Sequence, residues 1–204
     1  MHSFVVATGN PHKIEEIRAI LKEYPVELKS LADFDPTPEP VENGATYLEN
    51  ALIKARAYAR HTGAACLADD SGLEVDALGG QPGLHSARFA GADTPHSQKI
   101  LKVLERLADL PAEQRGARFR CVAALVYPDG REESVEGVCE GRIAQQPSGE
   151  GGFGYDPIFE LPRRGCTMAE LAAEEKNKIS HRARAFLGLM EALGIAPQSV
   201  SNSY

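Results

Sequence analysis

Several features that mark particular protein classes are scarce in this sequence. It has no tryptophan, and its longest apolar run, residues 121–127, is far shorter than the about 18 residues of a membrane span. No lysine or arginine precedes Lys13, and the apolar stretch before it covers only residues 4–7. We therefore expect neither a membrane-spanning segment nor a secretory signal.

Cysteine is also scarce, with four residues in the chain: Cys66, Cys121, Cys139 and Cys166. No two of them form a Cys-x-x-Cys pair, so a zinc cluster or a redox pair has little support. All four lie in apolar or mixed segments that read as strands. We predict buried free thiols in the reducing cytoplasm.

Basic residues are also fewer than acidic ones. Lysine and arginine number 22 against 29 acidic residues, which gives a net charge of −7. Because sequence-independent binding to nucleic acid needs a broad basic face, this charge argues against a nucleic-acid partner. The remaining composition is ordinary, with 204 residues, 43% hydrophobic and 25% charged. It is typical of one folded domain with a real core.

The spacing of apolar residues predicts strands mixed with helices. We expect strands over residues 3–8, 26–31, 64–68 and 73–78, the last two around a turn, and a hairpin formed by 118–127 and 131–143. Helices are expected over 12–24, 46–63, 94–110 and 168–194, the last broken near Asn177. Apolar faces are expected at Leu48, Leu52, Ala55 and Ala59 and at Ile100, Leu101, Leu104 and Leu107. An α/β class with a mixed sheet follows.

The segment Thr8-Gly9-Asn10-Pro11-His12-Lys13 joins the first strand to the first helix. Asn10 suits the N-cap position and Pro11 the first helical position. Such a turn presents backbone N–H groups at the positive end of the helix dipole, and Gly9 and Lys13 would admit and attract a phosphate. The alternative is a well-capped turn with a solvated lysine. The segment is not a Walker A motif.

Acidic residues form the second candidate. Glu42 lies in an acidic loop, and Asp69-Asp70-Ser71-Gly72 follows a buried strand. Because adjacent strand residues face opposite ways, we expect different roles for the two aspartates. Carboxylates at such a position are costly unless they hold a cation, and Mg²⁺ needs only one or two of them beside substrate phosphates. The alternative is an aspartate turn between two strands.

The helix after the acidic loop carries two further charged residues of interest. Thr46 and Glu49 have the spacing of a capping box, so capping is the expected role of Glu49. Lys54 is expected on a solvated face, unless this helix lines the site.

A glycine-rich loop, residues 148–157, is the third candidate. Its glycines permit unusual dihedrals and close approach to the backbone. Phe153 and Tyr155 offer faces on which a base can stack, and Asp156 can accept a hydrogen bond from a base N–H. The alternative is a loop whose aromatic residues belong to the core.

Basic residues close the set, with Lys176 followed by Ser180-His181-Arg182. Ser180 reads as an N-cap, which places His181 and Arg182 in a first helical turn. Positive charge opposes the helix dipole there, which points to function. The alternative is a surface basic patch with a structural histidine.

Five strings in this order resemble the inosine/xanthosine triphosphate pyrophosphatase family: TGNPHK (8–13), ENGATYLENALIKA (42–55), ADDSGLEVDALGGQPGLHSARFAG (68–91), GGFGYDPIF (151–159) and EEKNKISHR (174–182). The resemblance spans nearly the whole chain. It implies one domain over residues 1–204, with an elongated mixed β-sheet flanked by helices and two lobes around a central nucleotide cleft. It also implies a homodimer, a requirement for Mg²⁺ and a place in the cytoplasm.

The same resemblance implies a reaction and a role for each matching residue. Non-standard purine nucleoside triphosphates (ITP, dITP, XTP) would be hydrolysed to the monophosphate and pyrophosphate, which cleanses the nucleotide pool. Thr8, Gly9, Asn10, Pro11, His12 and Lys13 would cradle the phosphates. Glu42, Asp69 and Asp70 would hold Mg²⁺, with Asp70 also the proton acceptor. The nucleotide would be bound by Ser71, Phe153, Gly154, Tyr155, Asp156, Lys176, His181 and Arg182.

Three other readings remain open from the sequence. A related pyrophosphatase for pyrimidine triphosphates would share the fold, but GGFGYDPIF and SHR favour a purine. A nucleotide sensor without catalysis has no need for the two carboxylates of DDSG. A structural nucleic-acid-binding protein conflicts with the charge of −7.

Overall fold

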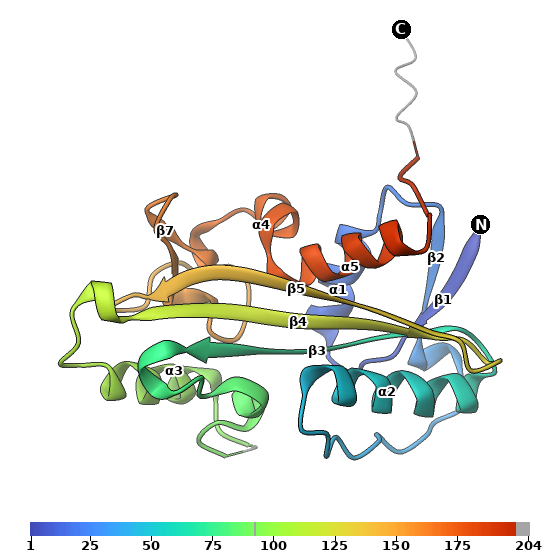
Figure 1. Cartoon of the computed structure of the whole chain (residues 1–204), viewed down its shortest axis with the longest axis horizontal. Coiled ribbons are helices and arrows are strands. Elements are labelled where there is room, and N and C mark those ends of the chain that lie inside the picture. The colour runs from blue at the N-terminus through green and yellow to red at the C-terminus, as the bar shows by residue number, and fades with distance from the viewer. Residues whose placement is uncertain (92, 199–204) are drawn as a thin grey trace, which may run out of the picture. The chain divides into compact units, whose positions relative to one another are not determined.

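Seven strands form one mixed sheet in the computed structural model, which describes residues 1–91 and 93–198 (Figure 1). β1 pairs in parallel with β2 and β3, whereas β6 pairs antiparallel with β5 and β7. The expected α/β class with a mixed sheet is thus confirmed. In the sheet order β2-β1-β3-β4-β5-β6-β7, the strands are β2 (Val26–Ser30), β1 (His2–Val6), β3 (Cys66–Val75), β4 (Gly116–Val126), β5 (Glu132–Ile143), β6 (Phe159–Leu161) and β7 (Cys166–Thr167).

The helices lie close to the predicted ranges. The structure has α1 (Pro11–Ile20), α2 (Tyr47–Thr62), α3 (His96–Arg106), α4 (Ala173–Ile179) and α5 (His181–Ala192). The helix expected over residues 168–194 is divided at Ser180 rather than near Asn177, and residues 168–170 form a 3₁₀ turn. Across the described residues, no helix combines the length and apolarity that a membrane span requires.

The chain forms two compact units, each with its own core. Unit 1 comprises residues 1–70 and 122–137 and the chain from Ala183 onward. Within it, α2 covers one side of the strands, and α1 and α5 cover the other (Figure 1). The α2 side is packed by Val5, Ala7, Ala55, Tyr58, Ala59, Cys66, Ala68 and Val126.

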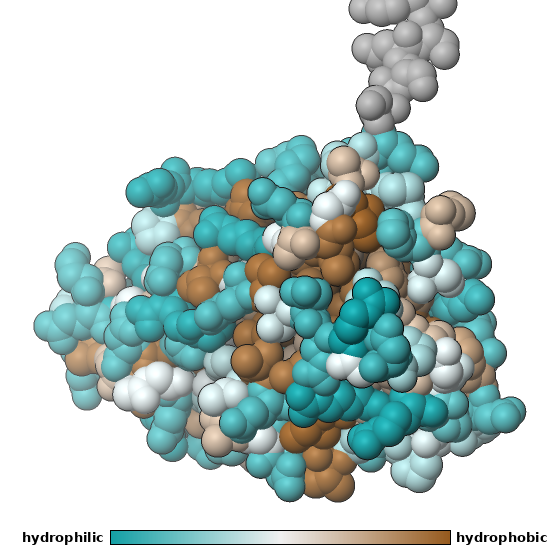
Figure 2. All heavy atoms as spheres, turned by 45° about the vertical axis from the view of Figure 1, so that its right-hand side comes forward, coloured by the Kyte–Doolittle hydropathy of each residue, from teal (hydrophilic) through white to brown (hydrophobic). Residues whose placement is uncertain are grey.

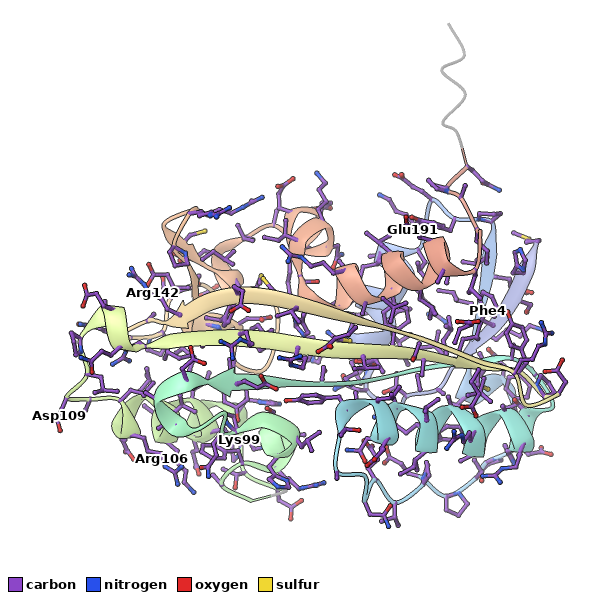
Figure 3. All side chains as sticks on the ribbon, viewed as in Figure 1. Phe4, Lys99, Arg106, Asp109, Arg142 and Glu191 are labelled. Atoms are coloured by element: carbon purple, nitrogen blue, oxygen red, sulfur yellow. The ribbon has the colours of Figure 1, made fainter. Side chains whose placement is uncertain are left out.

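Unit 2 comprises residues 71–121 and 138–182. Leu73, Val103, Phe119 and Phe159 are among its core residues. Arg142 of β5, labelled in Figure 3, forms a bidentate ion pair with Glu160 of β6, with N–O distances of 2.8 and 2.6 Å. Such planar pairing adds geometric specificity to the antiparallel β5–β6 register.

The prediction of two short strands around a turn at residues 64–78 is wrong. β3 runs without interruption from Cys66 to Val75, so Asp69 and Asp70 lie inside a strand. Asp and Gly disfavour strands, but tertiary partners override that preference. The ammonium groups of Lys13 and Lys54 face the two carboxylates and stabilise them in place.

The predicted helix faces need correction at two leucines. Leu48 of α2 is 40% exposed and Leu101 of α3 is 53% exposed. Hydrophilic side chains predominate on the face seen in Figure 2, with apolar ones exposed among them. The buried face of α2 instead includes two polar residues, Asn50 and Lys54, which shifts it around the helix relative to the apolar pattern.

The cysteines lie in strands as expected, in β3, β4, β5 and β7. All four are free thiols, and Cys66, Cys121 and Cys139 are buried. Cys166 is only partly buried. Burial raises the pKa of the Cys66 thiol, although a hydrogen bond with Thr62 works in the opposite direction.

Candidate functional site

The turn between β1 and α1 has the predicted cap. Asn10 Oδ1 accepts hydrogen bonds from the backbone N–H groups of His12, at 3.0 Å, and Lys13, at 3.4 Å. Pro11 is the first helical residue, and the Asn10 N–H donates to Thr8 Oγ1 at 3.2 Å. No atom lies within 4 Å of the position that a side chain would take at Gly9. The backbone at Gly9 is therefore open to close approach by a ligand.

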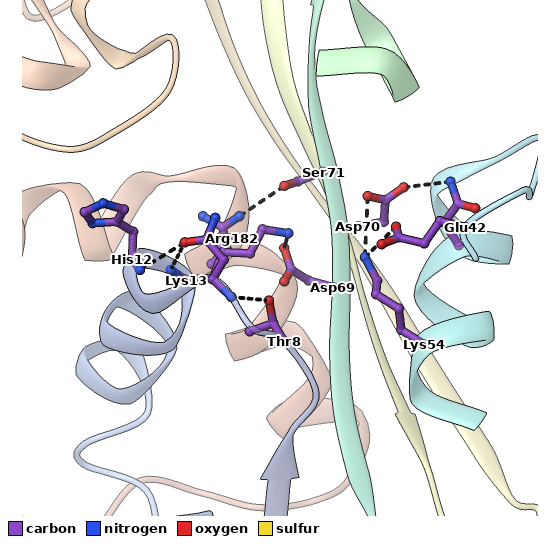
Figure 4. A network of polar contacts seen from close by, with 11 residues as sticks. Thr8, His12, Lys13, Glu42, Lys54, Asp69, Asp70, Ser71 and Arg182 are labelled. Carbon is purple, nitrogen blue, oxygen red and sulfur yellow. Dashed lines mark hydrogen bonds and ion pairs between the residues drawn. The ribbon is translucent and has the colours of Figure 1, made fainter. Parts of the chain in front are cut away.

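Lys13 is directed from α1 toward Asp69. Its Nζ lies 3.0 Å from Asp69 Oδ2, and the side chains of Lys13 and Asp69 are 15% and 0% exposed. Figure 4 shows this pair on the α1 side of β3. A fully buried carboxylate is costly without a charged partner, so the position of the Lys13 ammonium is closely specified by Asp69.

Asp70 is directed to the opposite side of β3, toward α2 (Figure 4). Lys54 Nζ lies 2.8 Å from Glu42 Oε2 and 3.8 Å from Asp70 Oδ1. Strand alternation thus separates the two aspartates, as the sequence predicts. Two carboxylates from distant segments, Glu42 and Asp70, converge on one cation.

The electrostatics of this group follow from burial and close charges. Burial raises the pKa of Asp70, although Lys54 and Lys13 lower it. Burial opposes the charge of Lys54, but the carboxylates of Asp70, Asp69 and Glu42 outweigh that effect and raise the lysine pKa. The raised pKa keeps Lys54 charged at neutral pH, where it offsets part of the charge of the two converging carboxylates.

Among the described residues, no three His, Cys, Asp or Glu side chains gather as a metal-binding set. Glu42 and Asp70 converge, whereas Asp69 pairs with Lys13 on the other side of β3. Two carboxylates nevertheless suit Mg²⁺, which takes hard oxygen ligands and completes its shell with water and phosphate oxygens. Their convergence on the Lys54 ammonium shows that a positive group is accommodated there.

Two residues of α2 belong to this group. Lys54, for which the sequence left open a solvated face or a place at the site, is 6% exposed, and Asn50, which the sequence analysis did not consider, is 3% exposed. Asn50 Nδ2 donates to Asp70 Oδ2 at 3.1 Å, and Asn50 Oδ1 accepts from the Gly44 N–H at 2.8 Å. Their spacing of four residues, which places them on one helix face, was the available signal. Thr46 caps α2, since its Oγ1 accepts from the Glu49 N–H at 3.1 Å. The Glu49 carboxylate accepts from the Ala45 N–H at 2.5 Å, one residue before the N-cap N–H that a capping box would use.

The glycine-rich loop of unit 2 is organised around Asp156. Asp156 Oδ2 lies 2.5 Å from Lys176 Nζ and accepts from the Phe153 N–H at 2.8 Å. The expected acceptor for a base N–H is therefore already engaged, through this oxygen, with the loop itself. At Gly152, where φ is +68°, the Cβ of any side chain would overlap the same oxygen, so only glycine fits.

Two cationic side chains lie close to the Phe153 ring. Lys176 Nζ lies 4.9 Å from the ring centroid, and the Arg182 guanidinium carbon lies 5.5 Å from it. Both distances are within the range of cation–π attraction. Arg182 is 1% exposed, and its Nη2 donates to Ser71 Oγ at 3.0 Å. Phe153, Lys176, Arg182 and Ser71 are thus held together within unit 2.

Tyr155 and His181 pack into the core of unit 2. Tyr155 is 4% exposed, and its hydroxyl donates to the Ser86 carbonyl at 3.0 Å. Burial raises the Tyr155 pKa. The His181 ring stacks on Phe119, with centroids 4.7 Å apart. For both residues, the structure shows the core packing that the sequence left as an alternative.

The remaining predicted site residues lie where the sequence places them. Gly154 lies between Phe153 and Tyr155 with φ of +66°, in the left-handed region that glycine adopts readily. Ser180 immediately precedes α5, so His181 and Arg182 begin that helix, as predicted.

Comparison with known proteins gives a family match over most of the chain. The model of the Ham1 family matches residues 4–192. A dITP/XTP pyrophosphatase of Geobacillus kaustophilus is 52% identical over 191 residues, 94% of each chain. One from Thermus thermophilus is 50% identical over 199 residues, 97% of this chain and 95% of that protein. The structure of a HAM1 protein from Coxiella burnetii matches with a TM-score of 0.86 and 41% identity, over 95% of this chain and 99% of that one.

Proposed function

The chain belongs to the Ham1 family, and we propose that it hydrolyses ITP, dITP and XTP to the monophosphate and pyrophosphate. Relatives that bear the name dITP/XTP pyrophosphatase support this proposal, since they are about half identical over nearly the full chain. The observation that carries the chemistry is the convergence of Glu42 and Asp70 on one side of β3, with the Lys13–Asp69 pair on the other side. The carboxylates can hold a metal cation, and the Lys13 ammonium can attract the negative phosphate oxygens.

In the proposal, unit 1 takes the triphosphate. The turn at residues 8–13 offers an open backbone at Gly9 and the Lys13 ammonium. Two unit charges 4 Å apart interact by about 4 kcal/mol at an effective dielectric near 20, so carboxylates alone would repel the phosphates. Glu42 and Asp70 would hold Mg²⁺, whose chemistry when bound is to neutralise phosphate charge and lower the pKa of a coordinated water.

The reaction places water on the α-phosphorus. The water oxygen forms a bond to that phosphorus, the bond to the bridging oxygen of the pyrophosphate group breaks, and the water proton must leave. Asp70 is the proposed proton acceptor, and its carboxylate is held in orientation by Asn50 at Oδ2 and by the Lys54 ammonium near Oδ1. General-base assistance of this kind contributes about 10²–10⁴-fold to a rate.

In the proposal, unit 2 recognises the base. Phe153 offers a ring for stacking, and Arg182 supplies only hydrogen-bond donors. Hypoxanthine and xanthine carry an acceptor oxygen at C6, whereas adenine carries an amino donor there. A site built on hydrogen bonds rejects the mismatched base because buried polar groups are left unpaired.

The proposal extends to the assembly and the location of the enzyme. We propose that the enzyme works as a homodimer, and that it resides in the cytoplasm, where its four thiols stay reduced. Sedimentation of the purified protein at micromolar concentration tests the dimer.

The decisive experiment identifies both products from ITP with Mg²⁺ present. Inosine monophosphate and pyrophosphate in equal amounts are expected. Inorganic phosphate as the primary product, with inosine diphosphate left behind, would contradict the proposal. Omission of Mg²⁺, with a chelator added, is expected to stop turnover.

A further inference from the structure

Asn50 links Asp70 to the loop that carries Glu42, and these are the two residues that the proposed function assigns to Mg²⁺. It is 3% exposed and lies in the first turn of α2, four residues before Lys54. Its side-chain amide makes two hydrogen bonds, one to a carboxylate and one to the backbone. Nδ2 donates to Asp70 Oδ2 at 3.1 Å, and Oδ1 accepts from the Gly44 N–H at 2.8 Å.

The bond to Asp70 fixes the orientation of that carboxylate. Asp70 lies in β3 with its side chain 14% exposed, and its other oxygen, Oδ1, lies 3.8 Å from Lys54 Nζ. A donor on Oδ2 and a cation near Oδ1 leave the carboxylate little freedom to rotate. An amide serves here because it donates without adding a second charge beside Lys54.

The bond to Gly44 fixes the loop that carries Glu42, two residues away. A second bond supports the same segment, because the Ala45 N–H donates to Glu49 Oε2 at 2.5 Å. The approach is close: a side chain at Gly44 would place its Cβ 2.6 Å from Glu49 Cβ and 2.8 Å from Asn50 Oδ1. The loop is therefore seated on the first turn of α2.

We propose that Asn50 is a positioning residue that sets the Glu42 and Asp70 carboxylates relative to one another through the two ends of one amide. Side chains that orient metal ligands typically contribute 10- to 100-fold to metal affinity or activity. This inference rests on the proposed function, because it takes Glu42 and Asp70 as the pair that holds Mg²⁺.

The experiment compares Asn50→Ala with Leu48→Ala, which shortens an exposed side chain in the same turn of α2. Two quantities are measured. One is the Mg²⁺ concentration that gives half-maximal ITP turnover. The other, independent of turnover, is the rate at which glutamyl endopeptidase cuts after Glu42 in the metal-free protein.

For Asn50→Ala, we expect the half-activating Mg²⁺ concentration to rise 10- to 100-fold and cleavage after Glu42 to accelerate, with Leu48→Ala unchanged in both. Asn50→Asp keeps an acceptor for Gly44 but replaces the donor to Asp70 with a carboxylate oxygen. Because the shape of the side chain is kept, this variant tests the inference even if Asn50→Ala folds poorly. Its cleavage rate is expected at the wild-type level and its turnover at saturating Mg²⁺ reduced.

Faster cleavage in Asn50→Ala with an unchanged Mg²⁺ requirement would make Asn50 purely structural and overturn the inference, as would wild-type turnover in Asn50→Asp. Glu42→Gln and Asp70→Asn separate this failure from failure of the proposed function. If these two raise the Mg²⁺ requirement and Asn50→Ala does not, only the role of Asn50 is wrong. If they leave it unchanged, the assignment of the metal to Glu42 and Asp70 is wrong.

Discussion

Removal of the Lys176 ammonium from Asp156 is expected to be among the most destabilising single changes in unit 2. The two charged atoms lie 2.5 Å apart, and the side chains are 6% and 3% exposed. At an effective dielectric near 20, this separation corresponds to a gross attraction of about 7 kcal/mol. Desolvation of both groups offsets much of that gain, so the pair itself adds little net stability. Loss of one partner is different, because the other charge stays buried.

The test is a double-mutant cycle measured by urea unfolding with circular dichroism at 222 nm. We expect Lys176→Met to lower the free energy of unfolding by about 3–5 kcal/mol, because the Asp156 carboxylate loses its ammonium partner. Asp156→Asn keeps an acceptor for the Phe153 N–H and removes the charge. The double variant Lys176→Met/Asp156→Asn is therefore expected to regain most of the free energy of unfolding that Lys176→Met loses.

Two results would refute the reasoning. The first is a decrease in the free energy of unfolding below about 1 kcal/mol for Lys176→Met. Solvent-exposed ion pairs have such values, so this result would mean that water screens the Lys176–Asp156 pair. A double variant as unstable as Lys176→Met alone would show that the lysine acts by packing on Phe153 rather than by charge.

Four further outcomes are expected. Asp70→Asn should lower ITP turnover about 10²-fold at saturating Mg²⁺ with an unchanged melting temperature, and near-normal turnover would remove it from catalysis. Wild type should prefer ITP to ATP by about 100-fold in kcat/KM, and Arg182→Ala should bring that ratio close to one. Because Arg182 is buried and its loss can also lower the overall rate, the ratio of the two kcat/KM values is the measured quantity. Gly152→Ala should raise the KM for ITP, since its Cβ would displace the Asp156 carboxylate; an unchanged KM would show that the loop yields without cost. Of the four thiols, Cys166 should react first with a disulfide reagent and the others only on unfolding, which a stoichiometric time course of thiol release checks.

Local sequence patterns were sufficient to predict those features that depend on residues close together in the chain. Asn10 and Pro11 predicted the start of α1 because a cap is built from residues two and three positions apart. The divergence of Asp69 and Asp70 followed from strand alternation alone. The hairpin of β4 and β5 followed from its turn signal and flanking strands.

The rest depended on partners that sequence spacing does not show. A turn at Asp69-Asp70 was the better local prediction, and the strand persists because lysines from two different helices lie beside it. Asn50 and Lys54 resemble surface residues until Asp70 is placed opposite them. Asp156 was expected to face a base, and only the fold shows that one of its oxygens is engaged by Lys176 and the Phe153 N–H.

Ser71 and Arg182 join the two ends of unit 2 to each other. They are the first and last residues of unit 2 in the chain, and the Arg182 guanidinium donates to the Ser71 hydroxyl at 3.0 Å. Apart from these ends, the chain crosses between the units only within β4 and β5. Segments whose ends meet are readily inserted, replaced or permuted. Unit 2 is therefore closed at its two ends by one hydrogen bond and holds the residues proposed to contact the base, while the carboxylates and lysines proposed to bind metal and phosphate lie in unit 1.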